Sequence, residues 1–169
     1  ATPGARASWH DFYVRYDPAT KQDKLYAPGG GGAFVYDITN PAEPRVIASV
    51  TGVAGQPDAH TFTPTPDGRY AVTMPLPTYQ YGVPRVFDLK PALDGQVKTV
   101  SRPIGAWTPS WRGAVHNFEV RWPYVFVSGQ SDAFQVFNMM DPTNPYTVGY
   151  YVTRPGPYLH GSGIAGFAE

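Results

Sequence analysis

The chain of 169 residues contains no cysteine, so it forms neither disulfide bonds nor thiolate metal sites. It also lacks an excess of either charge. Its 13 basic residues balance 13 acidic ones, which removes the electrostatic signature of a nucleic-acid-binding protein. No apolar run approaches the roughly 18 residues that a membrane-spanning helix needs, so we expect no transmembrane segment. The partners that remain are proteins, including those of a membrane-associated complex.

Turn formers and aromatic residues are abundant instead. The chain has 18 glycines and 19 prolines, and such a content could indicate disorder if apolar residues were scarce. They are not scarce, since 42% of the residues are hydrophobic and 15% are aromatic. A chain rich in turns and aromatic residues, without an amphipathic helix of useful length, is typical of an all-β protein.

An internal repeat organises the sequence. Segments 24–50, 69–100 and 124–151 align on one another, and each is preceded by a histidine with an aromatic residue two positions later. The openings are His10-Asp11-Phe12, His60-Thr61-Phe62 and His116-Asn117-Phe118, and a fourth begins at His160. All four histidines of the chain occupy this position.

The sequence pattern of each unit predicts four short antiparallel strands. Apolar residues alternate in the middle of the unit, and Asp-Pro, Asn-Pro and Asp-Gly turns end the strands. A period of about 45–50 residues is typical of the blades of a β-propeller, whereas a β-sandwich would not repeat the same opening and ending. We therefore expect a β-propeller-like array of four-stranded antiparallel blades within one domain, 1–169. The units are about 10–59, 60–115 and 116–159, and a fourth starts at 160.

Two further expectations concern the register of these units. Residues 96–100 are predicted to be the fourth strand of the second unit. Phe34, Val86 and Phe134 are predicted to occupy one equivalent position, and His10, His60 and His116 another.

Segments 34–46 and 134–145 resemble the LVIVD-repeat β-propellers, whose blades end in a hydrophobic residue, Asp and an Asn-Pro or Asp-Pro turn. The second unit departs with Leu89-Lys90-Pro91, and the third has Asn138 in place of the aspartate. The resemblance implies a secreted or envelope bacterial protein and is silent on activity. The start at Ala1, without a methionine, also favours a removed signal peptide and an extracytoplasmic location.

Three units and the start of a fourth do not close a propeller of about 4–8 blades. A blade packs both of its faces against neighbours, so the two outermost faces need a cover. We expect that cover from further sequence of the same protein or from another subunit, and the chain is predicted not to be a free monomer.

The first functional hypothesis follows from this need for partners. It is a non-enzymatic, extracytoplasmic protein that binds other proteins, as an accessory or structural subunit of a membrane-associated envelope complex such as an electron-transfer complex. Aromatic loop residues are the candidate partner-binding side chains because such residues dominate binding hot spots; packing over blade edges is the alternative. The candidates are Tyr79, Tyr81, Trp107, Trp111 and Tyr158.

The second hypothesis is a histidine-metal oxidoreductase of propeller architecture, similar in outline to the methanethiol-oxidase type. Equivalent blade positions form an arc at one end of the central channel, so His10, His60, His116 and His160 are candidate ligands of a metal ion. The alternative is that each histidine hydrogen-bonds within its own blade. No catalytic residue is predicted. The recurrent aspartates are expected to accept backbone N–H bonds in turns, and Glu119 and Arg121 to form a surface ion pair.

Overall fold

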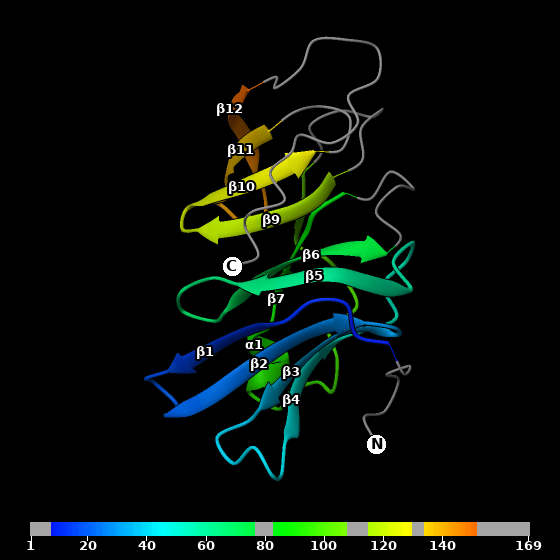
Figure 1. Cartoon of the computed structure of the whole chain (residues 1–169), viewed down its shortest axis with the longest axis vertical. Helices are drawn as coiled ribbons and strands as arrows, with labels where there is room; N and C mark the ends of the chain where they lie inside the picture. Colours follow the sequence, from blue (N-terminus) through cyan, green and yellow to red (C-terminus); the bar gives the residue numbers. More distant parts are fainter. Residues whose placement is uncertain (1–7, 77–82, 108–114, 130–133, 152–169) are drawn as a thin grey trace.

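The computed structural model describes residues 8–76, 83–107, 115–129 and 134–151. They form three four-stranded antiparallel sheets, each built from strands that are consecutive in the chain (Figure 1). The predicted all-β class and its four-stranded units are confirmed. The first sheet comprises β1 (Tyr13–Asp17), β2 (Gln22–Gly29), β3 (Gly32–Asp37) and β4 (Arg45–Val50). The second comprises β5 (Asp58–Pro64), β6 (Tyr70–Leu76), β7 (Arg85–Asp88) and β8 (Gly105–Ala106). The third comprises β9 (Val115–Arg121), β10 (Tyr124–Gly129), β11 (Phe134–Asn138) and β12 (Tyr146–Tyr151).

The sheets stack face to face with the second sheet in the middle (Figure 1). Alternation along each strand sends side chains to both faces, and two apolar cores fill the two contacts between sheets. Burial of each large side chain in these cores stabilises the fold by roughly 1.5–3 kcal/mol. The core between the first and second sheets includes Tyr26, Val35, Phe62, Phe87 and Leu89. The core between the second and third includes Val72, Val86, Phe118, Val125 and Phe137.

An acidic or amide side chain ends the third strand of every sheet. Asp37, Asp88 and Asn138 each accept a hydrogen bond from the backbone N–H two residues later, at 3.0, 3.0 and 2.7 Å. Asn138 keeps the turn because its amide oxygen accepts the same bond as a carboxylate would. Asp67 and Asp141 do the same in other turns. The turn-capping role expected of these aspartates is confirmed.

The strand ladders correct the predicted register. Val35, Val86 and Val136 are equivalent, because they pair with Tyr26, Val72 and Phe126 of the preceding strands. Phe34 lies one residue from this position and so on the opposite face, while Phe134 lies two residues away on the same face. The prediction aligned phenylalanine with phenylalanine, whereas the turns at Asp37, Asp88 and Asn138 set the register.

The fourth strand of the second sheet is β8, and the prediction of that strand at 96–100 is wrong. After β7, the single-turn helix α1 (Lys90–Leu93) reverses the chain and packs Ala92 and Leu93 against the first core. Residues that follow it then pair with the outer edge of the first sheet, where Val100 N–H donates to Ser49 O at 2.8 Å. The segment around Val100 of the second unit thus pairs with the free edge of β4 and shields it from solvent.

Candidate functional site

Three histidines occupy one equivalent position at the start of the three sheets. Tyr13, Thr63 and Glu119 pair with the equivalent residues Tyr26, Val72 and Phe126. His10, His60 and His116 each lie three residues before these positions (13 − 10, 63 − 60 and 119 − 116). The register predicted for the histidines is therefore confirmed.

A close backbone contact brings His10 to this position. The segment before β1 lies against the end of β2, where His10 N–H donates to Pro28 O at 3.1 Å and Gly30 N–H donates to Ser8 O at 2.8 Å. Gly29 is required there, because a Cβ at this residue would lie 2.1 Å from the Ser8 carbonyl oxygen. The tetraglycine stretch thus positions the first histidine.

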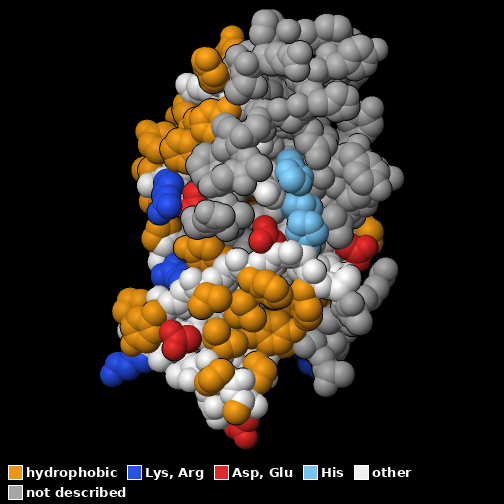
Figure 2. All heavy atoms as spheres, viewed as in Figure 1, with side chains coloured by type: hydrophobic (Ala, Val, Ile, Leu, Met, Phe, Trp, Pro, Cys, Tyr) orange, Lys and Arg blue, Asp and Glu red, His pale blue; other side chains and the backbone are white. Residues whose placement is uncertain are grey.

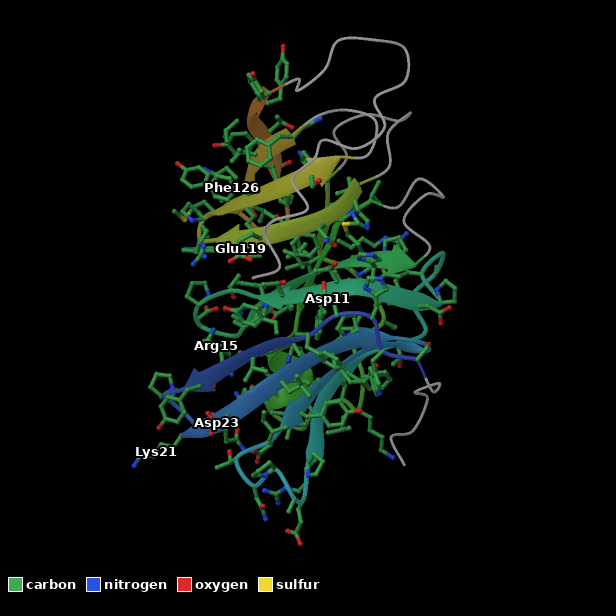
Figure 3. The ribbon with its side chains drawn as sticks, in the orientation of Figure 1. Asp11, Arg15, Lys21, Asp23, Glu119 and Phe126 are labelled. Atoms are coloured by element: carbon green, nitrogen blue, oxygen red, sulfur yellow. The ribbon has the colours of Figure 1, made fainter. Side chains whose placement is uncertain are left out.

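The three imidazoles form a continuous row across the stack, which we call the histidine row (His10, His60 and His116). The ring centroids of His10 and His60 are 3.7 Å apart, and those of His60 and His116 are 5.1 Å apart. Figure 2 shows the three side chains in contact as one column. Asp11, which follows His10, lies in front of β5 (Figure 3). His160 lies outside the described residues.

His60, in the middle of the row, is 2% exposed. Its Nδ1 lies 2.8 Å from Thr61 Oγ1, and the Thr61 hydroxyl donates to Asn117 Oδ1 of the third sheet at 3.4 Å. In the tautomer in which the Thr61 hydroxyl donates to Asn117, Nδ1 of His60 donates to Thr61; in the other tautomer, the hydroxyl donates to Nδ1. Burial, and then the neighbouring His10 and His116, lower the pKa of His60 from 6.5 to about 3. The imidazole of His60 is therefore neutral at physiological pH.

The ring nitrogens of His10 and His116 make no hydrogen bond within the part of the chain that the structure describes. The expected structural role, a hydrogen bond within the histidine's own sheet, is met by His60 alone among the described histidines. His10 is exposed and His116 is half-buried, so both rings are open to a ligand.

The described side chains do not form a preassembled metal site, since no group of three or more His, Asp or Glu among them converges on one point. Two imidazoles that share a tetrahedral ion at about 2.0–2.1 Å from their nitrogens have ring centres about 5 Å apart. The spacing of His60 and His116 fits this value, whereas the rings of His10 and His60 are too close and are tilted by 37° to each other.

Of the aromatic residues predicted to bind partners, Trp107 is the one that lies within the described residues. Trp107 is 5% exposed, stacks on Phe137 with centroids 4.4 Å apart, and donates from Nε1 to Thr147 Oγ1 at 2.9 Å. It ties the end of the second sheet to the third, so packing over sheet edges is the role that the structure describes. Tyr79, Tyr81, Trp111 and Tyr158 lie outside the described residues.

Apolar side chains also line the two outermost faces of the stack. We call the face of a sheet that points to the next sheet in the chain its forward face, and the opposite one its backward face. The forward face of the third sheet and the backward face of the first contact no described sheet. Apolar side chains gather over the first sheet in Figure 2. The backward face of the first sheet carries Val14, Leu25, Phe34 and Tyr36, and the forward face of the third carries Tyr124, Phe126, Phe134 and Val136.

These two faces also carry the contacts that partly cover them. Trp9 lies edge-on against Phe34 and Tyr36, with centroids 5.8 and 6.1 Å away, and is itself 42% exposed. On the third sheet, Glu119 and Arg121 form the expected ion pair at 3.2 Å (Glu119 is labelled in Figure 3).

No family model and no curated protein sequence matches this chain. The resemblance to LVIVD-repeat proteins therefore stays a prediction from the residues. Among the described residues, no helix is long and apolar enough to cross a membrane.

Proposed function

We propose that this chain is a section of a propeller-like ring that works by binding protein and has no catalytic activity of its own. The partner that its outer faces fit is another four-stranded sheet of the same kind, supplied by a second copy of the chain. The observation that carries the proposal is a contrast in burial between equivalent residues of the three sheets.

On the forward faces, Val35 and Val86 are 0% and 1% exposed because another sheet covers each of them. Their equivalent on the third sheet, Val136, is only half-buried. Likewise Tyr26 and Val72 are fully buried, whereas Phe126 is half-buried. The third sheet therefore presents the side chains of a sheet-to-sheet contact, and among the described residues no further sheet packs on them.

The backward faces show the same contrast at the other end of the stack. Phe87 and Phe137 are 0% exposed, whereas their equivalent on the first sheet, Tyr36, is half-buried. Val14, on the same face and paired with Leu25, is 58% exposed. Phe34 of this face is 1% exposed and packs against Trp9, so the exposed apolar area belongs to Val14 and, in part, to Leu25 and Tyr36. Exposed apolar side chains that gather on one face mark interaction sites.

The two exposed faces are complementary, which favours a second copy as the partner. Within the chain, each contact between sheets joins a forward face to a backward face. The forward face of the third sheet can therefore pack on the backward face of the first sheet in another copy. Two copies joined head to tail at both ends contain six sheets (two times three), which lies within the 4–8 blades of closed propellers.

The test is the oligomeric state of the purified chain by light scattering and sedimentation. We expect a dimer that Val136→Lys converts to monomer, because a lysine ammonium would be desolvated in the contact. Tyr124→Glu is a second variant, chosen because Tyr124 is 41% exposed and its replacement does not disturb a core. Val97→Lys is the matched control, since Val97 is exposed but lies on neither outer face. A wild-type monomer over the accessible concentration range, or a dimer unaffected by either face variant, would contradict the proposal.

The extracytoplasmic location and membership of an envelope complex rest on the resemblance and stay proposals. The oxidoreductase hypothesis requires first that the histidine row bind an ion, and ion binding is the part of it that the row supports.

A further inference from the structure

We propose that the histidine row binds one divalent first-row transition metal ion through imidazole nitrogens contributed by all three sheets. This proposal does not depend on the head-to-tail dimer, because His10, His60 and His116 belong to one chain. It concerns ion binding and assigns no redox reaction to the site.

The first support is the hydrogen bonding of the row. Nδ1 of His60 is engaged by Thr61 at 2.8 Å, and Thr61 in turn contacts Asn117, so Nε2 is the ring nitrogen that remains for an ion. A hydrogen bond from the distal nitrogen to an oxygen is the arrangement that orients a metal-ligating histidine and raises its basicity. Thr61 of the same strand is the direct partner of His60, and Thr61 contacts Asn117 of the third sheet, so residues of two sheets hold this imidazole in place.

The second support is the spacing of the rings. His60 and His116 have centroids 5.1 Å apart, which already suits two ligands of one tetrahedral ion. His10 must turn out of its contact with His60 to become the third ligand, and an exposed side chain makes such a rotation within nanoseconds. The ring nitrogens of His10 and His116 have no hydrogen bond to lose among the described residues. A rotamer change at His10, which is exposed, is therefore part of the binding that we propose.

The third support is the chemistry of the donor set. Three imidazoles without a thiolate suit Zn²⁺, Cu²⁺ and Ni²⁺, whereas Mg²⁺ and Ca²⁺ prefer oxygen ligands. An ion held by the row would also link the three sheets along one edge of the stack. Bound ion should consequently raise the melting temperature of the chain, since it binds the folded state and not the separated sheets.

The experiment is calorimetric titration of the full chain with Zn²⁺, and with Mg²⁺ as a negative control, near neutral pH. We expect one Zn²⁺ per chain, a raised melting temperature, and nitrogen hyperfine structure in the electron paramagnetic resonance spectrum of the Cu²⁺-loaded protein. His10→Ala should weaken Zn²⁺ binding by about 100-fold, because loss of even an outer-sphere partner costs about 10–100-fold. His116→Ala should have a similar effect.

Matched controls separate binding at the row from loss of fold or adventitious binding. His10 is exposed and precedes β1, so His10→Ala should keep the circular dichroism spectrum and the metal-free melting temperature. Glu43→Gln changes an exposed carboxylate in the turn between β3 and β4 and should leave Zn²⁺ binding unchanged. The proposal is overturned if the wild-type chain binds neither Zn²⁺ nor Cu²⁺, or if His10→Ala and His116→Ala bind like wild type. These results are independent of the oligomeric state, which sedimentation measures separately.

Discussion

Phe137 occupies the centre of the contact between the second and third sheets. Its side chain is 0% exposed and stacks on Trp107. Phe137→Ala should lower the free energy of unfolding by about 3–5 kcal/mol, because it removes buried surface and leaves a cavity. Chemical denaturation followed by tryptophan fluorescence measures the loss. Tyr150→Ala is the control on the same sheet, since Tyr150 is 73% exposed, and it should change stability by about 0.5 kcal/mol or less. Equal effects of the two substitutions would place the core elsewhere.

A buried ion pair gives a second prediction at a single residue. Lys24 Nζ lies 2.6 Å from Asp17 Oδ2, and both residues are buried. Burial raises the pKa of Asp17, but hydrogen bonds from Lys24, Ala19 and Thr20 outweigh it and lower that pKa from 3.8 to about 2. The folded state therefore binds fewer protons than the unfolded state between these values. The resulting stability, on the order of 2 kcal/mol, is fully present above pH 3.8 and is lost as the pH falls toward 2.

Asp17→Asn tests this pair by denaturation at neutral and acidic pH. At pH 7 the variant should be about 3–5 kcal/mol less stable, because Lys24 stays buried without its counter-charge. The difference from wild type should shrink below pH 3.8, where Asp17 itself becomes protonated. Asp94→Asn, which breaks an exposed ion pair with Lys90, should cost about 1 kcal/mol or less. A constant difference from pH 7 to pH 2 would show that the carboxylate charge is not what stabilises the fold.

At the scale of the strand, local chemistry made part of the fold predictable. Equivalent strands end at the turn residues Asp37, Asp88 and Asn138, each of which accepts one backbone hydrogen bond. The type and spacing of these residues therefore predict the repeat from the sequence. The histidine spacing was equally informative, because each histidine is tied to the same ladder position of its sheet. These signals are short-range, and the four-stranded units follow from them.

Other features of the strands depend on contacts between units and could not be predicted in the same way. The segment 96–100 has the composition of a strand, but only the reversal at α1 carries it to the edge of β4 in the preceding sheet. The predicted position of Phe34 is wrong because both faces of a sheet between neighbours are apolar, so hydrophobicity alone does not distinguish Phe34 from Val35. The contact between the imidazoles of His10, His60 and His116 likewise arises from the stacking of three sheets.

At the scale of the whole molecule, the way in which two copies join decides which outer faces are in contact. If like faces met, a dimer would need only one type of face. In the head-to-tail ring, each of the two contacts uses the forward face of the third sheet from one copy and the backward face of the first sheet from the other. A substitution on either face therefore damages both contacts of a homodimer.

Mixing two face variants distinguishes these arrangements. Val136→Lys alters the forward face of the third sheet, and Val14→Glu alters the backward face of the first, where Val14 is 58% exposed. Each variant alone should be monomeric in sedimentation velocity. An equimolar mixture should form dimers weaker than wild type, because one contact joins two unaltered faces and the other brings opposite charges together. Native mass spectrometry should then show one copy of each variant in every dimer. A mixture that stays monomeric, or a dimer that survives in either variant alone, would rule out the head-to-tail ring.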